Sequence, residues 1–76
     1  MDLDNLIVMA NRIGQFFVAQ PDREEALAGI ADHVKKFWEP RMRAQIRAAV
    51  GTEAGAGLSD IVSAALTAHR AMLQPA

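Results

Sequence analysis

Pro40 is the residue that most constrains how this chain can fold, because a proline breaks any helix that would run through it. It disfavours helical backbone geometry at Glu39, so a preceding helix should end near Trp38. Proline also suits the first position of a following helix, where its missing N–H group costs nothing. The segment from Phe37 to Arg43 is therefore predicted to be a tight corner between two helices.

The spacing of the apolar side chains predicts four helices. They should lie near residues 3–19, 22–38, 40–50 and 59–73. Asp22 is a good N-cap for the second helix and Ser59 for the last one, while the glycines of residues 51–58 predict a flexible loop. Alternation of β-branched residues is scarce, which disfavours strands. The sequence predicts one all-α domain, residues 1–76, folded as a small bundle of about four short helices.

The chain has 76 residues and no cysteine, so its core is small and no disulfide reinforces it. Domains of this size bury only about 60% of the surface that the unfolded chain exposes, and many rely on a disulfide, a metal or oligomerisation. The apolar stripe of the first helix is also wider than one core-facing side requires. We therefore expect the isolated chain to self-associate, with Leu3, Leu6, Ile7 or Phe16 at the contact.

Charge is distributed unevenly along the sequence. Residues 35–47 carry five basic side chains and one acidic side chain, a net charge of +4, whereas the whole chain has a net charge of −1. This segment is either a surface for an acidic partner or for phosphates, or an ordinary solvated junction between helices. A pI near 6.0 argues against binding to nucleic acid.

The sequence gives no sign of a membrane segment. No apolar run approaches the roughly 18–20 residues that a membrane-spanning helix needs. The first residues are acidic and lack the positively charged start of a signal peptide, and the absence of cysteine fits a reducing compartment. We expect a cytoplasmic protein that contacts neither a membrane nor nucleic acid.

The titratable residues do not form a recognisable catalytic pattern. His33 and His69 are the two histidines, and they lack the spacing of metal ligands. His33 is interpreted as an interfacial histidine with one hydrogen bond, in preference to a ligand or a general base. Residues 55–57 faintly resemble a phosphate-binding turn, but no strand precedes them and no Gly-Lys-Ser/Thr ending follows. We expect no catalytic, metal-binding or cofactor-binding residue in this chain.

The corner at Pro40 instead suggests a surface that binds another protein. Tryptophan and arginine are frequent binding hot spots, and Arg41 and Arg43 should emerge beside the Trp38 ring. The competing interpretation is that Trp38 is simply part of the core. The residues expected to bind a partner are Asn11, Phe16, His33, Phe37, Trp38, Pro40, Arg41 and Arg43.

Three segments also resemble a known family. Residues 9–17 read MANRIGQFF, residues 29–34 read GIADHV, and residues 37–43 read FWEPRMR. Together they resemble the delta subunit of bacterial NAD-dependent formate dehydrogenases, over residues 5 to about 50. The resemblance implies a small accessory chain in a soluble cytoplasmic complex, linked to assembly of the complex and to correct insertion of its molybdenum cofactor.

In that family, the catalytic subunit carries a pterin-bound molybdenum or tungsten and iron–sulfur clusters, and other subunits carry flavin and pass electrons to NAD. The resemblance therefore implies that the catalytic subunit of formate dehydrogenase is the partner and that this chain holds no cofactor itself. We expect a non-catalytic subunit that docks on the catalytic subunit. The alternative is a free-standing homo-oligomeric helical adaptor, and an enzyme in its own right is a third, weaker hypothesis.

Overall fold

The computed structural model describes residues 2–73, and within that range it is all-α, which confirms the predicted fold class. The elements are α1 (Leu3–Phe17), α2 (Arg23–Phe37), α3 (Pro40–Ala49), the 3-10 helix η1 (Glu53–Gly55) and α4 (Asp60–Ala68). None of these helices is both long and apolar enough to cross a bilayer.

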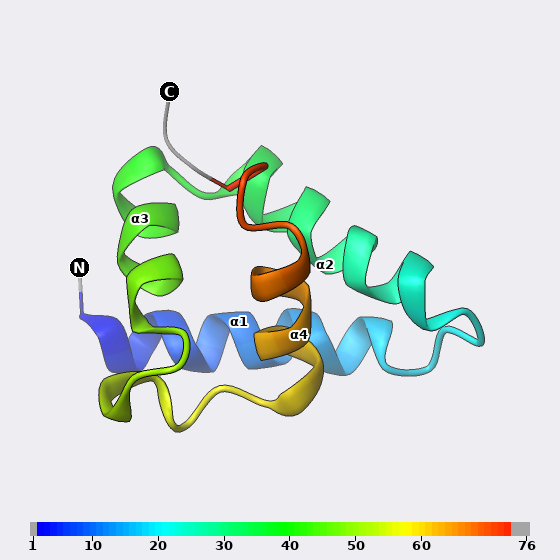
Figure 1. The fold of residues 1–76 in the computed structure, drawn as a ribbon, viewed down its shortest axis with the longest axis horizontal. Coiled ribbons are helices and arrows are strands. Elements are labelled where there is room, and N and C mark those ends of the chain that lie inside the picture. The colour runs from blue at the N-terminus through cyan, green and yellow to red at the C-terminus, as the bar shows by residue number, and fades with distance from the viewer. Residues whose placement is uncertain (1, 74–76) are drawn as a thin grey trace.

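The four helices surround one small core (Figure 1). α2 returns diagonally over α1, and α3 stands across the N-terminal half of α1. α4 lies between α2 and α3 and packs mainly on α2. The segment from α3 to α4, which includes η1, passes beneath the N-terminal half of α1.

Local signals explain where the helices begin. An oxygen of Asp22, the N-cap of α2, accepts hydrogen bonds from the backbone N–H groups of Glu24 and Glu25 at 3.0 and 3.3 Å. Pro40 is the first residue of α3, as its missing N–H group favours. Ser59 occupies the N-cap position of α4, but its hydroxyl makes no capping hydrogen bond, so the expected side-chain cap is wrong.

Two parts of the C-terminal third differ from the sequence-based expectation. α4 ends at Ala68 instead of near residue 73, and the turn that follows brings Leu73 into the core. Residues 51–58, expected to be a flexible loop, contain η1 and bury Gly55 and Leu58. Gly55 lies so close to the carbonyl group of Ala49 that no side chain would fit there.

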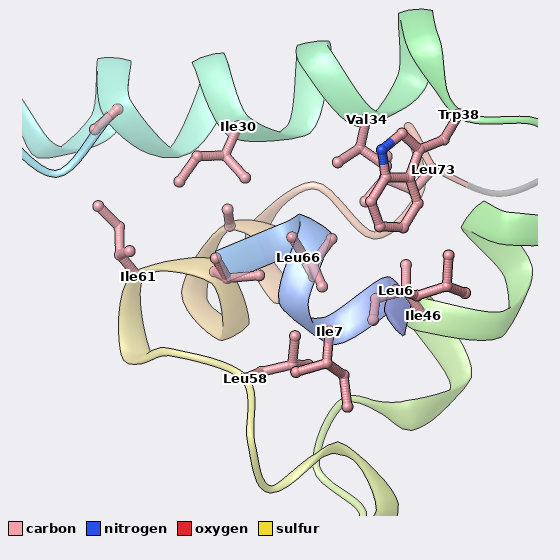
Figure 2. Close-up of a cluster of buried hydrophobic side chains, with 14 residues drawn as sticks. Leu6, Ile7, Ile30, Val34, Trp38, Ile46, Leu58, Ile61, Leu66 and Leu73 are labelled. Atoms are coloured by element: carbon pink, nitrogen blue, oxygen red, sulfur yellow. The ribbon is translucent and has the colours of Figure 1, made fainter. Parts of the chain in front are cut away.

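The core draws on every α-helix and on the segments that flank α4. Its buried members are Leu6, Ile7, Ala10, Ala26, Ile30, Val34, Trp38, Ile46, Leu58, Ile61, Val62, Ala65, Leu66 and Leu73. In Figure 2, the Trp38 ring points into this cluster, beside Val34 and Leu73. Burial of Leu6 and Ile7 corrects the expectation that they form a self-association contact, because these side chains are used inside the chain.

Candidate protein-docking surface

The indole of Trp38 is core and does not form an exposed surface at the corner. Trp38 follows the last residue of α2, and its backbone N–H group donates to the Val34 carbonyl at 2.9 Å. Only 5% of the residue is exposed. Of the two interpretations of Trp38, the structure therefore favours the one in which this residue is part of the core.

Arg43 is engaged within the chain. Its Nη1 donates to the carbonyl oxygens of Lys35 and Trp38, at 3.0 and 2.9 Å. The first carbonyl belongs to the last turn of α2 and the second to the residue that follows this helix, where backbone oxygens lack helical partners. Arg43 therefore ties the end of α2 to α3. One nitrogen of the expected arginine fork, Nη1, is thus already engaged within the chain, whereas Arg41 and Pro40 are exposed.

Asn11 also has an internal role. Its Nδ2 donates to the Gly57 carbonyl, and its Oδ1 accepts from the backbone N–H group of Ser59, both at 2.9 Å. Both ends of one side-chain amide therefore fasten the segment before α4 onto α1. This arrangement corrects the expectation that Asn11 is available to a partner.

Three of the expected partner residues, Phe16, His33 and Phe37, meet on one surface together with Ile13 and Phe17. We call this surface of five residues the aromatic face. Ile13, Phe16 and Phe17 belong to α1, and they line a shallow hollow together with His33 of α2. The rings of Phe16 and Phe17 meet edge to face, with centroids 5.1 Å apart, and those of His33 and Phe37 lie 4.7 Å apart. The shared hollow joins these two pairs of rings into one strip across α1 and α2.

Exposure distinguishes this strip from the core. Phe16 is 78% exposed and Phe37 is 71% exposed. Both rings are large and apolar, and rings of this kind are concentrated in the centres of protein interfaces. Phe17 is only partly exposed, because its ring lies directly on Gly29, where an added Cβ would collide with it.

His33 is the titratable member of the aromatic face. His33 contacts the Phe37 ring and makes no hydrogen bond within residues 2–73, in place of the single hydrogen bond expected. Beside it, Asp32 and Lys36 form an exposed ion pair at 3.0 Å. Residues 2–73 contain no group of three or more His, Cys, Asp or Glu side chains placed to hold a metal ion.

Sequence reasoning missed Ile13 and Phe17 as members of this surface. Both residues belong to the apolar stripe of the first helix, which is wider than one core-facing side requires. That surplus width was the available signal, since a stripe that exceeds the core leaves apolar side chains on a flank of the helix. The structure shows which side chains are left there.

The fold and this surface define a small all-α protein with an exposed aromatic face. Comparison with protein families matches residues 5–66 to FdsD, the NADH-dependent formate dehydrogenase delta subunit, and the chain belongs to this family. This result confirms the resemblance seen in the sequence and extends it past residue 50 into α4. Comparisons with curated proteins and with solved structures give no match.

Proposed function

We propose that this delta subunit is a non-catalytic chain that docks on the catalytic subunit of formate dehydrogenase. Docked there, it supports assembly of the cytoplasmic complex, or insertion and retention of the molybdenum cofactor. Under this proposal, the molybdenum or tungsten pterin, the iron–sulfur clusters and the flavin reside in other subunits.

The observation that carries the proposal is the aromatic face on a chain of a subunit family. Phe16 and Phe37 are exposed although the core of this chain is small and could use further apolar side chains. Burying an aromatic side chain against a partner gains roughly 1.5–3 kcal/mol of hydrophobic free energy. Docking therefore supplies stabilisation that a cysteine-free chain of 76 residues cannot obtain from disulfides.

The same surface also favours one alternative, a free-standing adaptor that pairs with copies of itself. Of the four side chains expected at a self-association contact, Leu6 and Ile7 are buried and Leu3 is partly buried. Phe16 remains exposed, so self-association of the isolated chain stays a prediction that now centres on the aromatic face.

Co-purification tests the proposal against this alternative. A tagged copy of the full chain, expressed in its native cells, should recover the catalytic subunit of the dehydrogenase. Recovery of this chain alone would contradict docking and support the self-associating adaptor. The untagged dehydrogenase serves as the control for binding to the resin.

Deletion of the gene tests the role in maturation. The dehydrogenase purified from such cells should contain less molybdenum or tungsten and oxidise formate more slowly, and a plasmid copy of the gene should restore both. A fully metallated and active enzyme without this chain would refute the maturation role. Oxidation of formate by the isolated chain would refute the non-catalytic assignment.

A further inference from the structure

We infer that the aromatic face receives an apolar segment of the catalytic subunit that carries carboxylates at the end nearest Arg41. This inference rests on the proposed docking function and adds the surface used and the chemistry of the segment it binds. The described residues support it in three ways: the shape of the face, the charge beside it, and the division of the basic side chains there into engaged and exposed ones.

The shape of the face favours a segment laid between two helices. Ile13, Phe16 and Phe17 of α1 and His33 of α2 line the hollow. Phe37 extends the strip by one turn of α2, through its ring contact with His33. An apolar segment that lies in a groove between helices is a common mode of protein recognition, with a few aromatic or aliphatic anchors.

The basic corner lies at one end of this strip. Residues 35–47 have a net charge of +4. Four residues span at most about 14 Å, so Arg41 lies within that distance of Phe37 along the chain. Arg41 is therefore an exposed cation whose Cα lies within about 14 Å of the Phe37 end of the strip.

The basic side chains at this corner are not equally available to a partner. Arg43 is held by two backbone carbonyls, and Lys36 is paired with Asp32. Arg41 and Lys35 are exposed, and neither forms an ion pair within residues 2–73. Guanidinium groups bind carboxylates through two parallel hydrogen bonds, so an acidic end of the partner segment suits Arg41.

The charge also argues against a second copy of this chain as the occupant. Two copies that share the strip symmetrically around Phe37 would bring their basic corners together. Like charges placed opposite one another disfavour association. An acidic segment on a different chain removes this repulsion and covers the same rings.

Equilibrium binding of the full-length chain to the purified catalytic subunit tests the inference. We expect the Phe16→Ser/Phe37→Ser variant to bind about 100-fold more weakly, because exposed aromatic anchors dominate interface energies. Arg41→Glu should weaken binding about 10-fold at low ionic strength, and less at high salt because salt screens an exposed ion pair. Two matched controls should bind within about twofold of the unaltered chain. Val18→Ser is the control for the phenylalanine changes, because Val18 is an exposed apolar residue on the hollow between α1 and α4. Arg70→Glu is the control for Arg41→Glu, because Arg70 is an exposed cation after α4.

The possible results separate the inference from the proposed function. If the unaltered chain binds and the double variant binds equally well, the aromatic face is not the docking surface, while the docking function stands. If the unaltered chain does not bind the catalytic subunit, both ideas fail. If the double variant loses only self-association, measured by sedimentation, a second copy is the occupant and the inference is wrong.

Folding of the variants is checked by helical circular dichroism and by the midpoint of urea unfolding. Serine and phenylalanine have similar helix propensities, and both rings are largely exposed, so the double variant should retain its helices. Should it unfold, the single variants Phe16→Ser and Phe37→Ser provide the same comparison, each with an expected loss of about 10-fold.

Discussion

At the scale of single residues, two side chains that look like docking residues hold the chain together. Asn11 fastens residues 57 and 59 to α1, and Arg43 joins the last turn of α2 to α3. Asn11 reaches backbone groups 46 and 48 positions further along the chain. None of these four hydrogen bonds could be predicted from the sequence, because each one depends on how the finished elements pack.

The two neighbouring arginines should differ in their effect on stability. Arg43→Met keeps most of the aliphatic stem but removes the donor to two carbonyls, so we expect the free energy of unfolding to fall by about 1–3 kcal/mol. Arg41→Met is the matched control and should change it by less than about 0.5 kcal/mol, since Arg41 is exposed. Urea unfolding followed by circular dichroism measures both, and equal losses would contradict the structural role of Arg43.

Trp38 offers a spectroscopic test of its position. It is the sole tryptophan, so the fluorescence of the isolated chain reports on this residue alone. Because the indole is buried in the core, we expect emission that is blue-shifted from that of tryptophan in water, and weak quenching by acrylamide. Red-shifted, readily quenched emission would mean that the corner is open to solvent.

At the scale of helices, the close approach of α1 and α4 depends on Gly14. A Cβ built at this position would lie 2.6 Å from Cγ2 of Val62, closer than carbon atoms pack. The Asn11 bonds hold the start of α4 in the same region. Gly14 and the side-chain amide of Asn11, one turn earlier in α1, therefore both fix the position of α4.

Replacement of Gly14 tests this helix contact. Gly14→Ala should lower the free energy of unfolding by about 1–3 kcal/mol through overpacking, even though alanine favours helix more than glycine does. Gly57→Ala is the matched control, because its Cβ would lie 3.5 Å from Ile7 Cγ2, an ordinary contact distance. Thermal unfolding of both variants, compared with the unaltered chain, tests this expectation. If Gly14→Ala is more stable than the unaltered chain, α1 and α4 can separate at little cost and the prediction is wrong.

The helix starts that carry a local chemical signal could be predicted from the sequence. A helix end that carries no such signal could not. The caps and the proline place the starts of α2 and α3 from neighbouring residues alone. α4 ends at Ala68 in an alanine-rich stretch that carries no stop signal. Its end is set by Leu73, which must turn back to reach the core.

The candidate site was predictable only in part, for a related reason. Phe16, His33 and Phe37 were expected to bind a partner, and the structure brings them onto one surface. Helical spacing alone shows that aromatic side chains share a flank of a helix, and it does not show which of them the neighbouring helices cover. That selection depends on the finished packing, in which Trp38 is buried beside Val34 and Leu73 and Phe37 stays exposed (Figure 2).

At the scale of the whole molecule, the chain separates stability from recognition. The core, the Arg43 bonds and the Asn11 bonds lie within the bundle, whereas the aromatic face and Arg41 lie on its surface. The chain belongs to a dehydrogenase subunit family, and docking on the catalytic subunit is the proposed use of that surface. Changes to the face are therefore expected to affect assembly of the complex more than folding of the chain.

Site-specific photo-cross-linking in the assembled dehydrogenase tests docking through the aromatic face most directly. A benzophenone amino acid placed at position 37 of the full chain should form a covalent cross-link to the catalytic subunit, because Phe37 is proposed to lie in the interface. The same group at position 18 is the control, since Val18 is 62% exposed but lines the hollow between α1 and α4. Cross-linking from position 37 with little from position 18 is the predicted result, and the reverse pattern would contradict docking through this face.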